Sequence, residues 1–155
     1  MLNRLTSHVG LLRRAVFVFA LFLNACVTYP VQVTIHSNSI LNPDEKNRSL
    51  PVMIKFYQLN NRQVFTDATF RDLWLSPREA LGSALQKEMT IVIGPGEKKS
   101  FRFDHNGQVR YLAAVAIFRK PTGDRWRTIK QIGQDLPILI DRISVNVMNR
   151  HITMH

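Results

Sequence analysis

The sequence predicts an all-β domain, built as a two-sheet antiparallel β-sandwich with a short helical insertion. About seven short apolar segments are separated by turn residues roughly every ten positions, which is typical of a sandwich. Only residues 65–86 place their large apolar side chains at a spacing close to that of a helix. Apolar residues make up 45% of the chain and charged residues 21%, so a real core can be buried.

The first segment, residues 1–25, is typical of an export signal. Residues 1–14 contain Arg4, Arg13 and Arg14 but no acidic residue, and residues 15–23 form an unbroken apolar run. As a helix this run spans about 14 Å, roughly half of the hydrocarbon core of a bilayer. We therefore expect a cleaved signal peptide rather than a transmembrane helix.

Cys26 follows this leader directly and is the only cysteine of the chain. Leu23, Asn24, Ala25 and Cys26 resemble a bacterial lipobox, although Asn24 departs from the usual small or hydroxyl residue at its position. The resemblance implies a diacylglyceryl thioether on Cys26, cleavage before it, and residues 26–30 as a lipidated tether. Residue 27 is Val rather than Asp, and by the sorting pattern of bacterial lipoproteins this suggests the outer membrane, with the domain facing the periplasm. The alternative is a plain secretory signal with an incidental cysteine.

The predicted sandwich covers residues 31–149. Residues 31–35 alternate apolar and polar side chains and predict a half-buried strand, and residues 52–59 predict a second one. Between them, residues 37–50 are polar and contain Asn, Pro, Asp and Ser, which indicates a long loop of the kind that often carries function.

The helical insertion is predicted between the second and third strands. Ser76, Pro77 and Glu79 have the pattern of a capping box with proline at the first helical position, so a short helix should begin there. The strands then continue at residues 89–93, 99–103, 109–118, 126–132 and 143–147. Residues 109–118 are almost entirely apolar, which predicts a central strand covered on both faces. Residues 150–155 are expected to be a polar, frayed tail.

The charge does not indicate a nucleic-acid partner. The formal net charge is +10, but three arginines lie in the leader and the other cations are scattered over the domain. No basic helix interleaved with aromatic residues occurs. A solvated basic surface, or one that faces an acidic partner or anionic lipid, is the preferred interpretation.

Nothing in the sequence argues for catalysis, so we expect no enzyme, no cofactor apart from the covalent lipid, and no small-molecule substrate. The only cysteine lies at the anchor and no Gly-x-Ser-x-Gly elbow occurs. His151 and His155 have metal-ligand spacing only if they are helical, and a solvated tail is preferred to a metal site. Asp67, Asp72 and Glu79 could suggest paired carboxylates, but surface charge is the simpler interpretation.

Several short motifs, in their order, resemble the TssJ family of type VI secretion outer-membrane lipoproteins. Besides the lipobox, they are residues 41–44 (LNPD), 55–59 (KFYQL), 65–73 (FTDATFRDL), 111–116 (YLAAVA) and 126–127 (WR). The resemblance implies a transthyretin-like β-sandwich. It also implies binding to the periplasmic C-terminal domain of the inner-membrane TssM subunit, as part of the type VI secretion membrane complex.

In that family the loop between the first two strands takes part in the contact with TssM. This implies a partner-binding surface here that consists of Asn42, Pro43, Asp44, Glu45, Lys46 and Arg48. One alternative is a solute-binding or pilot lipoprotein of another envelope machine. A second, a transthyretin-like hydrolase, would require a C-terminal Tyr-Arg-Gly-Ser that this chain lacks.

Overall fold

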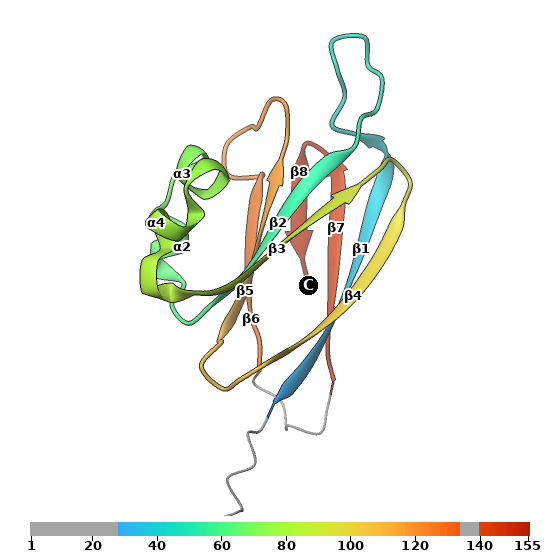
Figure 1. Cartoon of the computed structure of the whole chain (residues 1–155). Coiled ribbons are helices and arrows are strands. Elements are labelled where there is room, and N and C mark those ends of the chain that lie inside the picture. Colours follow the sequence, from blue (N-terminus) through green and yellow to red (C-terminus); the bar gives the residue numbers. More distant parts are fainter. Residues whose placement is uncertain (1–27, 134–139) are drawn as a thin grey trace, which may run out of the picture.

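A computed structural model describes residues 28–133 and 140–155, so the signal peptide, Cys26 and the first part of the tether lie outside the described residues. Two four-stranded sheets face each other, with strand orders β4-β1-β7-β8 and β3-β2-β5-β6 (Figure 1). The strands are β1 Tyr29–Leu41, β2 Val52–Leu59, β3 Leu85–Ile93, β4 Lys98–His105, β5 Tyr111–Ile117, β6 Arg127–Gln131, β7 Asp141–Asn149 and β8 His151–Met154. The predicted two-sheet sandwich is confirmed.

One pair of neighbouring strands departs from the antiparallel prediction. β1 pairs with β4 antiparallel but with β7 parallel, with Val33 opposite Ile143 and Ile35 opposite Val145. The parallel pair joins the first and the seventh strand, and the whole second sheet lies between them in the sequence. Such a pairing needs a long crossover, which local patterns do not reveal.

The core lies between the sheets and is formed by the apolar side chains that alternate along each strand. Val31, Val33 and Ile35 of β1 are fully buried against Ile54 and Phe56 of β2 and their neighbours in one continuous cluster. β5 is buried along almost its whole length, as its apolar sequence predicts. Its inner face contacts the core, and its outer face lies under the helical insertion.

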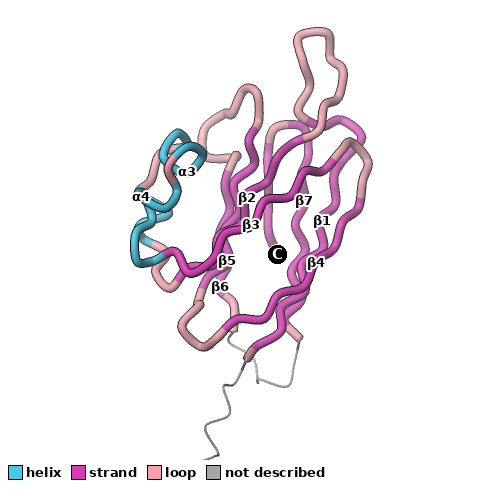
Figure 2. The backbone as a smooth tube through the Cα atoms, in the orientation of Figure 1, coloured by secondary structure: helices cyan, strands magenta, loops and turns pink. Residues whose placement is uncertain are grey.

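The helical insertion follows β2 and covers the outer face of the β3-β2-β5-β6 sheet (Figure 2). It consists of α2 Gln63–Asp67, α3 Phe70–Leu75, α4 Pro77–Leu81 and the 3₁₀ turn η1 Gly82–Ala84. Pro77 does begin α4, but the Ser76 side chain makes no capping hydrogen bond. The capping box forms instead one helix earlier, where Thr69 and Asp72 bond reciprocally to each other's backbone N–H groups.

Side chains of β2 and β6 hold the insertion on the sheet by donating hydrogen bonds to its carbonyls. The Tyr57 hydroxyl donates a hydrogen bond of 2.6 Å to the Leu73 carbonyl. The Arg127 guanidinium donates from Nη1 to the carbonyls of Phe65, Thr66 and Ala68. Because these carbonyls lie at the end of one short helix and just beyond it, one side chain of β6 satisfies groups that the helix cannot.

The C-terminal segment differs from the prediction of a frayed tail at residues 150–155. Residues His151–Met154 form β8, which pairs antiparallel with β7. Asn149 adopts a positive φ of 49° at the tight turn that joins the two strands, a conformation that asparagine tolerates better than most residues. The segment is polar because it is an edge strand, with only Ile152 fully buried.

Candidate partner-binding loop

The loop between β1 and β2, residues 42–51, projects beyond the end of the sandwich (Figure 1). It is shorter than the predicted residues 37–50, because β1 continues through Leu41. The loop lies at the opposite end of the molecule from Tyr29, where β1 begins. β1 has 13 residues, so the two ends are separated by about 40 Å.

Asn42 fastens the base of the loop. It is almost completely buried, and it adopts a positive φ of 44°. Its side-chain amide donates to the Pro51 carbonyl at 3.1 Å, and its side-chain oxygen accepts from the Arg119 backbone N–H at 2.9 Å. Its own N–H donates to the Asn149 carbonyl. Asn42 therefore joins the loop to two other connections at this end and is a structural residue.

Asp44 organises the tip of the loop. Its carboxylate accepts from the backbone N–H groups of Lys46 and Arg48 at 2.9 Å each, and from the Arg48 guanidinium at 2.8 Å. The hydrogen bond from the Arg48 backbone N–H contributes most to lowering the pKa of Asp44 below its usual value. The Asp44 side chain is only 8% exposed, whereas that of Arg48 is 70% exposed.

The exposed members of the predicted set are Glu45, Lys46 and Arg48. Glu45 forms a bidentate hydrogen-bonded pair with Arg119 at 3.1 and 3.2 Å, and Lys120 lies 3.8 Å from it. A hydrogen bond from its own backbone N–H, followed by the Arg119 side chain, lowers the pKa of Glu45. The charged loop tip is thus braced against the connection between β5 and β6.

The structure separates the six predicted residues by role. The side chains of Glu45, Lys46 and Arg48 are exposed to solvent. Those of Asn42 and Asp44 form hydrogen bonds that hold the loop in its shape. Pro43 is half-buried, and its carbonyl accepts a long hydrogen bond from Arg150 at 3.4 Å. Sequence patterns do not reveal the contacts of Arg119 and Lys120 with Glu45, because these residues lie more than 70 positions away from it.

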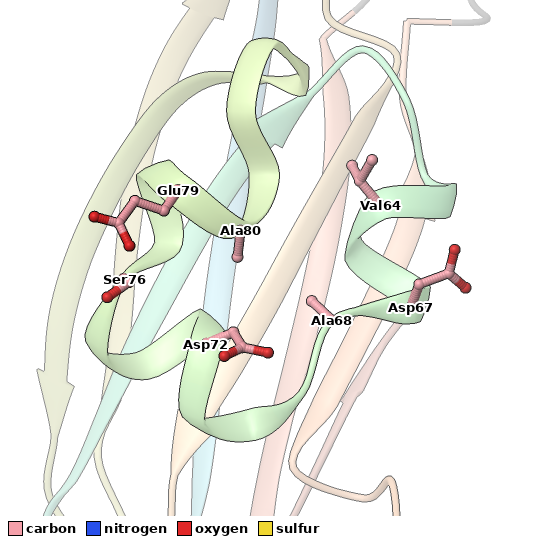
Figure 3. A pocket seen from close by; sticks show the side chains of 7 residues that line it. All are labelled: Val64, Asp67, Ala68, Asp72, Ser76, Glu79 and Ala80. Atoms are coloured by element: carbon pink, nitrogen blue, oxygen red, sulfur yellow. The ribbon is translucent and has the colours of Figure 1, made fainter.

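The carboxylates of the helical insertion do not form a catalytic pair. Asp67, Asp72 and Glu79 lie around an open hollow of about 500 Å³, but they come from three different helices and do not converge (Figure 3). Asp67 accepts a hydrogen bond from Gln63, and Asp72 is part of the capping box with Thr69. Both groups therefore already have partners within their own helical segment.

The two C-terminal histidines are not arranged as metal ligands. His151 begins β8 and His155 follows its last residue, and in an extended chain residues four apart lie about 13 Å from each other. No group of three or more His, Cys, Asp or Glu residues within 28–133 and 140–155 is arranged to hold a metal ion. None of the helices in this part of the chain has the length and apolar composition needed to cross a membrane.

The fold and the loop define a class of protein: a small β-sandwich that presents an ordered, charged loop at one end. Residues 29–150 match the family described as "Type VI secretion lipoprotein, VasD, EvfM, TssJ, VC_A0113". The chain belongs to this family of type VI secretion lipoproteins. The resemblance of the sequence to the TssJ family is therefore confirmed.

Solved structures share the same fold. TssJ1 from Pseudomonas aeruginosa is 21% identical with a TM-score of 0.74, and the match covers 82% of this chain and 95% of that one. The Lip protein of Serratia marcescens is 16% identical with a TM-score of 0.76, covering 83% and 97%. A chain in a structure described as the TssM C-terminal domain from EAEC is 14% identical with a TM-score of 0.67, covering 81% and 97%. A comparison with curated protein sequences finds no match.

Proposed function

We propose that this lipoprotein is acylated on Cys26, is held on the periplasmic side of the outer membrane, and binds the periplasmic domain of a TssM-like inner-membrane protein through loop 42–51. No chemical turnover is part of this role. The protein would act as the outer-membrane attachment point of the type VI secretion membrane complex.

The observation that carries the proposal is the placement of the loop. β1 begins at Tyr29, three residues after Cys26, and ends where the loop begins. An acyl chain on Cys26 would therefore hold one end of the sandwich at the membrane while the loop points about 40 Å away from it (Figure 1). A partner that approaches from the periplasm would meet the loop first.

The order of the loop also favours a binding role. Asn42 fixes its base, Asp44 fixes its tip, and Glu45 joins it to Arg119. A loop that is fixed by its own side chains loses little conformational entropy on binding, so more of the contact energy remains as affinity. Lys46 and Arg48 are exposed at the tip and are available to a partner.

The comparisons support the proposal through the family. A matched structure is described as the TssM C-terminal domain, and another is described as a type VI membrane complex. These descriptions belong to those structures, and we extend them to this chain as a hypothesis.

The partner contact can be tested with Lys46→Glu. The Lys46 side chain makes no hydrogen bond or ion pair with another described residue, so the change should not alter thermal stability. We expect binding to a purified TssM periplasmic domain to weaken about tenfold, which is about 1.4 kcal/mol. Lys87→Glu, the same change on exposed strand β3, is the matched control and should bind normally. Equal affinity of both variants would reject the loop as the contact surface.

The anchor is tested separately with Cys26→Ser. The variant should move from the membrane fraction to the soluble periplasmic fraction and lose labelling by a fatty-acid probe. Unchanged membrane fractionation of the variant would reject acylation of Cys26 as the anchor.

A further inference from the structure

The outer face of the β4-β1-β7-β8 sheet carries a polar, basic surface near the start of β1. Its strand register places Arg102 of β4 and Arg142 of β7 on either side of Gln32. The next outward row along the same three strands contains Ser100, Thr34 and Ser144, and Lys98 lies one row further. We call the basic patch the set Gln32, Thr34, Lys98, Ser100, Arg102 and Arg142.

No helix lies over this face in the described part of the chain, in contrast to the other sheet (Figure 2). The patch is also concave. Gln32, Thr34, Lys98 and Arg142 line a hollow of about 490 Å³ together with neighbouring residues. A shallow hollow that is rimmed by cations suits a small anionic group such as a phosphate.

The positive charge of the patch is not neutralised by the described residues. Lys98, Arg102 and Arg142 are exposed, and no carboxylate of residues 28–133 or 140–155 lies within 4 Å of their charged groups. Asp104, opposite Pro30, is the only acidic residue among the outward positions of β4, β1 and β7. Unpaired surface cations of this kind attract an anionic surface.

The length of chain between the patch and the proposed anchor identifies that surface. Cys26 and Tyr29 are separated by three residues, which span about 10 Å at most. Gln32 lies only three residues further along β1, so its row is about 20 Å of chain from the acylated residue. Electrostatic attraction to a lipid surface acts over about 8 Å, so the patch is drawn to the bilayer when the tethered domain leans the outer face of its β4-β1-β7-β8 sheet toward the lipid.

We infer that the basic patch docks on anionic phospholipid headgroups of the bilayer that holds Cys26. This inference rests on the proposed acylation. The docked patch would fix the tilt of the sandwich on the membrane, and it would leave loop 42–51 at the far end of β1 free for the protein partner.

The experiment uses the acylated mature protein in lipid vesicles. Since Cys26 is the only cysteine and its thiol carries the lipid, Ser100→Cys introduces a single free thiol within the patch. Its rate of reaction with a water-soluble maleimide is compared in vesicles of phosphatidylcholine and in vesicles that also contain phosphatidylglycerol. We expect at least fivefold slower labelling with the anionic lipid, and recovery of the rate in high salt. Ser39→Cys, an exposed position at the far end of β1, should react at the same rate in both.

A charge variant separates docking from other causes of slow labelling. Arg102→Gln with Arg142→Gln should restore the fast rate of Ser100→Cys on anionic vesicles. The matched control, Arg71→Gln with Arg78→Gln, removes two exposed cations from the helical insertion and should leave the slow rate unchanged.

Two results would overturn the inference: equal labelling of Ser100→Cys in both kinds of vesicle, or slow labelling that arises only when a periplasmic protein extract is added. The latter would assign the patch to an acidic protein instead. The mass of the acylated N-terminal peptide and flotation with vesicles report the anchor independently. An acylated, floating protein with unprotected Ser100→Cys would reject the patch alone, whereas a protein without acyl chains would reject the proposed function.

Discussion

Tyr57→Phe should weaken the attachment of the helical insertion to the sandwich. The Tyr57 side chain is fully buried, and its hydroxyl donates to the Leu73 carbonyl at 2.6 Å. The substitution keeps the ring but leaves that carbonyl without its donor, which costs about 1–3 kcal/mol. For a domain of this size the cost corresponds to a decrease in Tm of about 4–12 °C. Thermal unfolding by circular dichroism measures the decrease.

The matched control is Tyr111→Phe. Tyr111 is half-buried, and its hydroxyl makes no hydrogen bond to another described residue, so its Tm should change little. Hydrogen exchange should show that Tyr57→Phe speeds exchange mainly in α3 and α4. An unchanged Tm for Tyr57→Phe, or the same loss in both variants, would contradict the assigned role of the hydroxyl.

The same tyrosine makes stability depend on alkaline pH. Burial, followed by the charge of Glu88, raises the pKa of Tyr57 well above its usual value. Because the raised pKa belongs to the folded state, the folded protein holds this proton more tightly than the unfolded chain. Its contribution is complete below about pH 10, the usual tyrosine pKa, and is lost as the pH rises further. Tyr57→Phe should remove this part of the alkaline decrease in the free energy of unfolding.

Three further substitutions test the loop and the insertion. Asp44→Ala should raise the hydrogen-exchange rate of the Lys46 amide, because the carboxylate that accepts its hydrogen bond is removed. In the unmodified protein this amide should be protected at neutral pH and should lose its protection only as the pH falls through the lowered pKa of Asp44. A protected Lys46 amide in the variant would be evidence against the bond. Asn42→Ala should lower the free energy of unfolding by about 2–3 kcal/mol, because the part-buried Pro51 carbonyl and Arg119 N–H lose their hydrogen bonds and alanine tolerates the positive φ poorly. A denaturant titration that shows no loss would contradict this. Arg127→Met should lower the free energy of unfolding by about 1–3 kcal/mol in the same titration, because three carbonyls of the insertion lose their donor. Arg125→Met, at an exposed position, should have little effect. Similar decreases in both variants would argue against the three carbonyl contacts.

Local patterns predicted the strands well where one face is buried. Residues 52–59 form β2 with the predicted bounds, because their alternation reflects contact with the core. β1 extends to Leu41, beyond the predicted Ile35, since its later residues Ser37, Asn38 and Ser39 are polar and their pairing depends on neighbouring strands. β8 was missed for the same reason: an edge strand buries few side chains, so its sequence resembles a tail.

The candidate loop could be located from the sequence, but the roles of its residues could not. Asn42 and Asp44 are polar residue types that are common at protein contacts, yet their side-chain oxygens accept hydrogen bonds from backbone N–H groups of this protein. This distinction depends on the positive φ of Asn42 and on Arg119, which is distant in the sequence. The partner-binding role of the loop and the acylation of Cys26 stay predictions.

β1 joins the two ends of the molecule in one continuous strand. It begins at Tyr29, next to the proposed anchor, and passes at Leu41 directly into loop 42–51. A mechanical pull between membrane and partner would therefore run along the covalent backbone of β1, with β4 and β7 as lateral support on both sides. The tension would not have to cross the sheet from strand to strand. The hydrogen bonds between β1 and its neighbours would then carry little of the load.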